Sequence, residues 1–182
     1  AIETVKEYAK TSSAANVIIS YQPKEKDQSI SENYFVTKGS DILHEQLCEK
    51  EYYYSVQGFF RNNPVMAEQM IVYVKELFSQ YSDTNGSQLL DLYGGVGTFG
   101  IALADLFEKV YVMELFAPSI DLANKNIEEN KLTNVSALVG DVKQFYKLSF
   151  DKSKKTFVLV DPPRSGIVPK ALVRLKELSP PV

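Results

Sequence analysis

A glycine-rich segment follows an apolar run, and its residue types suit the binding of a nucleotide-like cofactor. Gly95–Gly100 reads Gly-Val-Gly-Thr-Phe-Gly and comes shortly after the run Leu89–Leu92. Glycines between a strand and a helix let the backbone approach a ligand closely, and the helix presents free N–H groups. This GxGxxG pattern fits a dinucleotide as well as S-adenosylmethionine, since both carry an adenosine ribose. The alternative is that the glycines serve only a tight turn.

Two acidic residues follow predicted strands at positions where they could contact the same cofactor. Glu114 ends the second strand, in VYVMELF, and an acid there can accept a hydrogen bond from a ribose hydroxyl. Asp141 follows the third strand, where it could receive the edge of an adenine ring. Aspartate also favours the N-cap of a helix, and both interpretations of Asp141 can hold together.

A further acidic loop separates the two cofactor classes. FVLVDPPRSG reads as a strand buried on both faces that ends at Asp161, at the sheet edge where open α/β folds bind ligands. Pro162 and Pro163 stiffen the backbone, and Arg164 could pair with a carboxylate or a phosphate. A dehydrogenase does not need this motif, so it favours S-adenosylmethionine. The alternative is a stiff loop with a salt bridge between Asp161 and Arg164.

The elements that must hold these residues alternate between strand and helix from residue 61 onward. Strands are predicted at Leu89–Leu92, Val110–Met113, Val135–Val139 and Phe157–Val160. Helices are predicted from Pro64 through MAEQMIVYVKELF, at about 98–107, 116–130 and 141–148, and from near Val168. The alternation predicts an α/β fold, a doubly wound parallel sheet with helices on both faces.

Residues 1–60 show a different sequence pattern, with short strand-like runs in place of alternating strands and helices. The chain begins with the helix-like AIETVKEYAK, and short strand-like runs follow at Val17–Tyr21, Tyr34–Thr37 and Tyr52–Gln57. The polar stretches KEKDQS and KGSD separate them. We expect part of a small antiparallel sheet, too thin to form an independent domain.

The composition excludes several other classes of protein. The single cysteine, Cys48, excludes an internal disulfide and any cysteine-based zinc or iron–sulfur site within these residues, and it reads as a small, partly buried thiol. His44 is the only histidine, so we expect no metal site and place His44 at the surface. No apolar run approaches the roughly 20 residues needed to span a bilayer, and no signal peptide is apparent. A reducing cytoplasm is the expected compartment.

Three segments together resemble the RNA uracil carbon-5 methyltransferases, which make 5-methyluridine in transfer and ribosomal RNA. They are Gly58–Pro64 (GFFRNNP), Leu90–Ile101 and Asp161–Gly166. The glycine-rich segment is shared with other Class I methyltransferases, whereas DPPRxG with an upstream FFxxN is much narrower. The resemblance implies a Rossmann-like Class I domain that binds S-adenosylmethionine over residues 61–182, and a partial β-rich intermediate region over residues 1–60.

The same resemblance implies roles for individual residues. The S-adenosylmethionine site would be lined by Arg61, Tyr93, Gly95, Gly97, Thr98, Glu114, Asp141 and Asp161. Asp161 and Arg164 would also border the target base as supporting catalytic residues. Phe59 and Phe60 would lie near a flipped-out uracil, where aromatic stacking is common, unless they are ordinary core residues. RNA, transfer or ribosomal, is the expected partner. The net charge of −3 argues against a free-standing RNA binder, so affinity would come from another domain.

The chemistry of the family needs a nucleophile that these residues do not place near the motifs. In the family a cysteine attacks carbon 6 of uracil, carbon 5 takes the methyl group, a base removes the carbon-5 proton and the cysteine leaves. That cysteine lies in a Ser-Cys-Asn turn well after DPPRxG, so we expect it beyond Val182, in a truncated chain that binds cofactor without methylating RNA. The family usually has glutamine at the position of Arg61 and often cysteine at that of Gly94.

Three other interpretations stay open at this point. Another Class I RNA methyltransferase, acting on guanine or cytosine, would carry a different motif after the fourth strand. An NAD-dependent oxidoreductase would use the GxGxxG loop and would not need DPPR. A non-catalytic module that binds S-adenosylmethionine is the third interpretation, if Val182 is the natural end.

Overall fold

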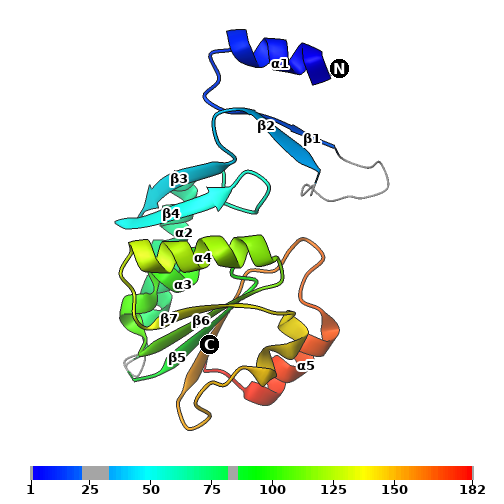
Figure 1. Cartoon of the computed structure of the whole chain (residues 1–182). Helices are drawn as coiled ribbons and strands as arrows, with labels where there is room; N and C mark the ends of the chain where they lie inside the picture. The colour runs from blue at the N-terminus through cyan, green and yellow to red at the C-terminus, as the bar shows by residue number, and fades with distance from the viewer. Residues whose placement is uncertain (1, 22–32, 82–85, 182) are drawn as a thin grey trace.

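The computed structural model describes residues 2–21, 33–81 and 86–181. Figure 1 shows a layered α/β body that carries a smaller, mostly β part at its N-terminal end. The polar stretch KEKDQS and part of the loop YSDTNGSQ lie outside the described residues.

A parallel sheet forms the centre of the α/β body. Its strands are β5 (Gln88–Leu92), β6 (Lys109–Glu114), β7 (Val135–Val139) and β8 (Thr156–Val160). They are parallel and lie in the order β7-β6-β5-β8. The chain therefore adds strands first on one side of β5 and then on the other. Ligands of open α/β folds bind beyond the carboxyl ends of the strands at such a switch point.

Helices cover both faces of the sheet, as predicted (Figure 1). On one face α2 (Pro64–Ser79), α3 (Thr98–Ala102) and α4 (Ala117–Glu129) enclose a core that contains Leu89 and Phe157. On the other face the 3-10 helix η2 (Val142–Lys147) and α5 (Pro169–Leu178) pack over Leu90 and Leu92. Successive side chains of β5 therefore enter opposite cores, as strand geometry requires.

The N-terminal part contains two separate antiparallel hairpins rather than one small sheet. Helix α1 (Ile2–Thr11) precedes β1 (Val17–Ser20) and β2 (Tyr34–Lys38), which pair with each other. The second hairpin joins β3 (Ile42–Leu47) to β4 (Lys50–Ser55). Strand β3 was not predicted, because its turn is Cys48-Glu49 and carries no glycine. Both residues adopt the positive φ angles (48° and 63°) that a two-residue hairpin turn requires.

Two predicted helices are shorter or tighter than expected. The helix predicted at 98–107 is α3 followed by a 3-10 turn, η1 (Ala104–Leu106). The side-chain amide of Asn134 donates to the carbonyls of Ala104 and Phe107, which satisfies groups that a longer helix would pair internally. The helix predicted at 141–148 is the 3-10 helix η2.

The remaining predicted elements are confirmed, with ends shifted by one or two residues. Pro64 is the first residue of α2, and the side chain of Asn63 caps the helix by accepting the Met66 N–H at 3.1 Å. Within the described residues, none of the helices combines the length and the apolar character needed to cross a membrane.

Candidate functional site

The segment between β5 and α3 forms a tight loop at the switch point of the sheet. Tyr93, Gly95 and Gly97 all have positive φ angles, of 64°, 56° and 85°. The Gly97 N–H donates to the Gly94 carbonyl at 2.8 Å, and α3 begins at the next residue. Glycine adopts this backbone at little cost, whereas Tyr93 carries strain. The predicted strand–loop–helix is confirmed, and cofactor contact by Gly95 and Gly97 stays a prediction.

A buried aspartate lies under this loop. The Asp91 side chain is fully buried, and its Oδ2 accepts the Gly100 N–H at 2.8 Å. Its Oδ1 has no hydrogen-bond partner among the described residues. Burial raises the pKa of Asp91 to about 7, against the effect of the Gly100 hydrogen bond, and the negative charges of Asp161 and Glu114 add to the rise. Asp91 was not among the residues predicted for the site. The one indication in the sequence was an acidic residue within an otherwise apolar strand.

Gly94 in the loop and Gly100 in α3 leave no space for larger residues beside Asp91. A Cβ atom on Gly94 would lie 2.5 Å from Val112 Cγ1, and one on Gly100 would lie 2.6 Å from Val112 Cγ2. Both distances are far below van der Waals contact. Val112 lies opposite Asp91 in the register of β5 and β6. The glycine at position 94, where the family often has cysteine, thus matches the close approach of Val112.

Glu114 ends β6 directly beside the loop. Its Oε2 accepts the Gly95 N–H at 3.3 Å, and its Oε1 accepts the N–H groups of Leu115 and Phe116 at 2.7 and 2.9 Å. These hydrogen bonds orient the carboxylate at the C-terminal edge of the sheet. The prediction that Glu114 ends the second strand of the sheet is confirmed, and its contact with a ribose stays a prediction.

Arg61 and Asp161 form an ion pair that joins two of the motifs. A guanidinium Nη2 of Arg61 donates to Asp161 Oδ2 at 2.6 Å, with both side chains partly buried. The guanidinium also lies 5.4 Å from the centre of the Phe99 ring, at a distance typical of cation–π contact. The Asp161 N–H donates to the carbonyl of Leu92 at 3.4 Å. The DPPR loop is thereby held against the end of β5.

Arg164 does not pair with Asp161, contrary to the alternative raised for this motif. Its side chain is exposed, and the partner of Asp161 is Arg61. The loop turns back after the prolines, where the Gly166 N–H donates to the Pro163 carbonyl at 2.8 Å. Arg164 is therefore available to a ligand at the surface, and its supporting role stays a prediction.

Asp141, Thr98 and Tyr93 lie at the same end of the sheet. Asp141 caps η2 by accepting the Lys143 N–H at 2.9 Å, which holds the pKa of its carboxyl below the usual value. Thr98 is the first residue of α3, and the Tyr93 hydroxyl is buried with no partner among the residues described. The N-cap interpretation of Asp141 is confirmed, and cofactor contact by all three stays a prediction.

Phe59 and Phe60 point into different environments. Phe60 is buried, and its ring stacks on Tyr54 with centroids 3.9 Å apart. Phe59 is 68% exposed and lies 6.0 Å from the Arg61 guanidinium. An open pocket of about 320 Å³ lies here at the start of α2, lined by Phe59, Phe60, Arg61, Asn62, Asn63, Met66 and Ala67. Of the two rings, Phe59 is the one available for stacking on a base.

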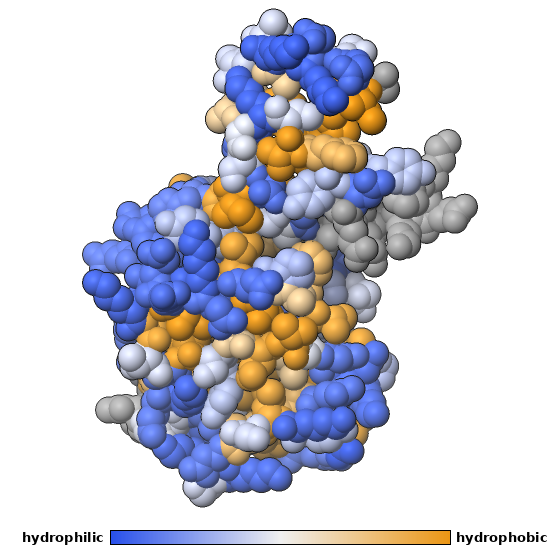
Figure 2. Space-filling view, viewed as in Figure 1, coloured by the Kyte–Doolittle hydropathy of each residue, from blue (hydrophilic) through white to orange (hydrophobic). Residues whose placement is uncertain are grey.

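Exposed apolar side chains border the acidic residues. Leu115, directly after Glu114, is 66% exposed, and Val139, at the end of β7, is 56% exposed. Figure 2 shows the apolar residues of this face gathered in a band between the polar surfaces over α4 and α5. Two exposed aliphatic residues at adjacent strand ends suit contact with the faces of a flat ring.

Cys48 and His44 lie away from these motifs, in the β3–β4 hairpin. The Cys48 N–H donates to Glu68 on α2, and burial raises the pKa of the partly buried thiol. The ring of His44 contacts Glu51 through Nε2 at 2.5 Å and is exposed. No group of three histidine, cysteine or acidic residues in the described ranges is arranged to hold a metal ion.

The fold and the loop geometry are those of a Rossmann-like Class I methyltransferase domain. The family model described as tRNA (Uracil-5-)-methyltransferase matches residues 24–178, and the chain belongs to this family.

Two curated relatives support this membership. An uncharacterised RNA methyltransferase of Caldanaerobacter subterraneus is 35% identical over 170 residues, which cover 93% of this chain and 37% of the relative. One from Nanoarchaeum equitans is 31% identical, over 85% of this chain and 32% of the relative. The chain thus spans about a third of the length of the curated relatives it matches.

Solved structures of methyltransferases share the fold. The tRNA (uracil-54, C5)-methyltransferase of Pyrococcus abyssi, solved with S-adenosyl-L-homocysteine, superposes with a TM-score of 0.67 at 28% identity. The match covers 91% of this chain and 39% of that one. The tRNA m1G37 methyltransferase of Methanocaldococcus jannaschii gives a TM-score of 0.57 at 17% identity, over 80% of this chain and 42% of that one, and shares the fold alone.

Proposed function

We propose that the loop between β5 and α3 binds S-adenosylmethionine in an enzyme that methylates carbon 5 of a uridine in transfer or ribosomal RNA. The observation that carries the proposal is the meeting of the glycine loop, Glu114 and the Arg61–Asp161 pair at the switch point of the sheet. Family membership and the S-adenosyl-L-homocysteine complex of the Pyrococcus relative support it. In this arrangement the Glu114 carboxylate accepts hydrogen bonds from the ribose hydroxyls, and Leu115 and Val139 flank the adenine ring.

The charge around the loop favours S-adenosylmethionine over a dinucleotide. Three carboxylic acids, Asp91, Glu114 and Asp161, lie close enough for the last two to raise the pKa of the first. A ligand with a sulfonium and an ammonium group is attracted to such a site, whereas a pyrophosphate is repelled. Helix α3 has only five residues, so the positive end of its dipole does little to offset the repulsion between these carboxylates and a pyrophosphate. The NAD-dependent alternative is therefore disfavoured.

The chain supplies binding and orientation rather than the nucleophile. S-adenosylmethionine, when bound, provides the electrophilic methyl group. Asp161, fixed by Arg61, and the exposed Arg164 border the position of the target base, and Phe59 offers a ring for stacking. We assign the covalent step to a cysteine outside residues 1–182, because Cys48 lies in the β3–β4 turn against α2.

Calorimetric titration of the chain with S-adenosylhomocysteine tests the cofactor, with NAD as the parallel ligand. We expect micromolar binding of S-adenosylhomocysteine, at least tenfold weaker binding by Glu114→Ala, and unchanged binding by Glu128→Ala. Glu128 is an exposed glutamate at the far end of α4 and serves as the matched control. Binding of NAD in place of S-adenosylhomocysteine contradicts the proposal.

A further inference from the structure

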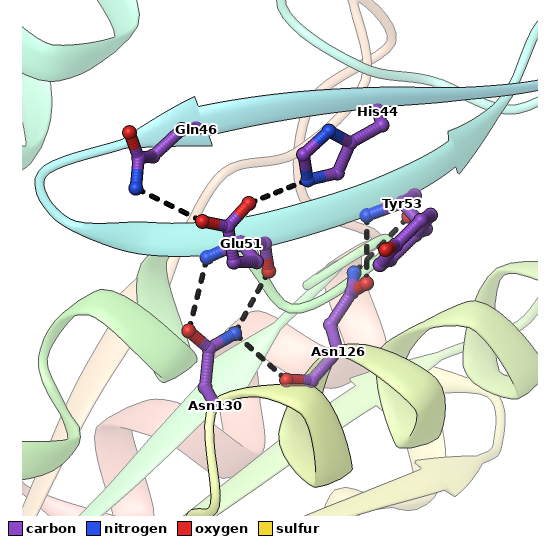
Figure 3. Close-up of polar contacts among 6 residues, drawn as sticks. All are labelled: His44, Gln46, Glu51, Tyr53, Asn126 and Asn130. Atoms are coloured by element: carbon purple, nitrogen blue, oxygen red, sulfur yellow. Dashed lines mark hydrogen bonds and ion pairs between the residues drawn. The ribbon is translucent and has the colours of Figure 1, made fainter.

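Asn126 of α4 and Asn130, the C-cap residue of that helix, bind the free edge of strand β4 (Figure 3). Asn130 Oδ1 accepts the Glu51 N–H at 2.9 Å, and its Nδ2 donates to the Glu51 carbonyl at 2.8 Å. Asn126 makes the same pair with Tyr53, at 2.7 and 3.1 Å. Each side-chain amide therefore pairs with both backbone groups of one strand residue, as a neighbouring strand would.

The spacing of the two asparagines matches the spacing of the strand. Asn126 and Asn130 are four residues apart on a helix, a rise of about 6 Å, and Glu51 and Tyr53 are two residues apart on a strand, about 6.6 Å. In the register of the hairpin Glu51 lies opposite Gln46, and Tyr53 lies opposite His44. The two asparagine side chains thus pair with the backbone N–H and C=O groups on the edge of β4 that faces away from β3.

Asn126 makes one contact that Asn130 does not. Its Nδ2 also donates to the carbonyl of Val96, inside the glycine loop, at 3.1 Å. Asn126 is fully buried and Val96 nearly so, which strengthens the need for this carbonyl to be paired. The second donation of Asn130 Nδ2 goes instead to the Asn126 carbonyl, in the last turn of α4, at 2.8 Å.

A second link joins the same strand to the loop. The Tyr52 side chain is fully buried, and its hydroxyl donates to the carbonyl of Thr98 at 3.1 Å. Strand β4 is therefore attached on both sides of Gly97, to Val96 through Asn126 and to Thr98 through Tyr52. Every second residue of the loop, Tyr93, Gly95 and Gly97, has a positive φ angle. A loop of this kind needs contacts from outside to hold one conformation.

We propose that Asn126 is a positioning residue, which uses strand β4 as a fixed support and holds the glycine loop in the conformation that binds cofactor. The proposal rests on the proposed function for the identity of that cofactor. In physical terms, the buried Asn126 amide couples the β3–β4 hairpin to the Val96 side of the loop, beside the separate link from Tyr52 to Thr98. A change in β4 therefore alters cofactor affinity without touching the cofactor.

The test compares Asn126→Ala with Asn130→Ala, which removes the same kind of strand contact one helical turn away. Amide hydrogen exchange on the ligand-free chain is the first readout. We expect Asn126→Ala to speed exchange of the Gly97 amide at least tenfold and Asn130→Ala to leave it within twofold. Faster exchange of the Glu51 amide in Asn130→Ala shows that this control has lost its own contact. Equal exchange of Gly97 in the two variants overturns the proposal.

Affinity for S-adenosylhomocysteine, measured well below the melting temperature of both variants, is the second readout. We expect at least fivefold weaker binding by Asn126→Ala and less than a twofold change in Asn130→Ala. If the wild-type chain does not bind this ligand, the proposed function fails, and the exchange data alone decide the role of Asn126. If Asn126→Ala does not fold, Asn126→Asp replaces it, because the shape and the acceptor for the Tyr53 N–H are kept. Loop exchange as slow as in the wild type overturns the proposal.

Discussion

Arg61 and Asp161 are 100 positions apart in the chain, yet an Arg61 N–H donates to Asp161 Oδ2 at 2.6 Å. The pair joins the segment before α2 to the loop after β8. Both residues belong to motifs through which the chain resembles the uracil carbon-5 methyltransferases. The contact explains how an arginine is accommodated where the family usually has glutamine, since the aspartate beside it is a matching partner.

The Arg61–Asp161 pair is expected to stabilise the fold modestly. A double-mutant cycle with Arg61→Gln and Asp161→Asn should give a coupling free energy of about 1 kcal/mol in urea denaturation, because both side chains are only partly buried. The exposed i,i+3 pair Arg174–Glu177 is the control and should give a clearly smaller coupling free energy. Equal coupling free energies in the two pairs would contradict the expectation that the partly buried Arg61–Asp161 pair stabilises the fold more than an exposed pair does.

The buried acid Asp91 is expected to make stability depend on pH. Its pKa is about 7 in the folded chain against an ordinary 3.8, so folding favours the protonated form. The stability that this group contributes is complete below about 3.8 and is lost as the pH rises toward about 7. Above pH 7 its contribution is constant.

Asp91→Asn removes this titration and keeps an acceptor for the Gly100 N–H. The difference in unfolding free energy between variant and wild type should therefore move in favour of the variant between pH 4 and pH 7. The slope is at most about 1.4 kcal/mol per pH unit. Urea denaturation across this range measures it, and a difference independent of pH would show that Asp91 is already ionised in the folded chain.

Gly94→Cys is expected to destabilise the chain by about 1–3 kcal/mol, because the added Cβ would meet Val112 Cγ1 at 2.5 Å. Val112→Ala removes that methyl group, so the double variant should be more stable than the sum of the two single changes predicts. Strictly additive losses in thermal denaturation would mean that the loop moves away instead.

Phe59 and Phe60 are expected to respond differently to alanine. Phe60→Ala should cost about 3 kcal/mol or more, because the ring is buried and stacked on Tyr54. Phe59→Ala should change stability by less than about 0.5 kcal/mol, because its ring is mostly exposed. A large loss for Phe59→Ala in chemical denaturation would place that ring in the core and remove it as a stacking surface.

Local patterns were sufficient to predict the parallel sheet and the loop. The apolar strands, the glycines and the acid after the second strand each leave a signal within a few residues. The β3 strand left none, because its hairpin turn contains Cys48 and Glu49 at positive φ in place of glycine.

Contacts between distant segments could not be predicted in the same way. Nothing near Asp91 indicates that its carboxylate accepts the Gly100 N–H, and nothing near Asn126 indicates that it binds Tyr53 and Val96. A salt bridge between Asp161 and Arg164 was raised only as an alternative, and the partner of Asp161 is Arg61, which nothing near Asp161 in the sequence indicates. Such pairings depend on which strand ends the sheet brings together.

The proposal of uridine carbon-5 methylation is tested most directly by nucleoside analysis. Transfer and ribosomal RNA from cells with and without the gene for this chain would be digested and measured by mass spectrometry. The account predicts that 5-methyluridine disappears from at least one RNA class and returns when the gene is restored. Unchanged 5-methyluridine, with loss of a methylated guanosine or cytidine instead, would contradict it.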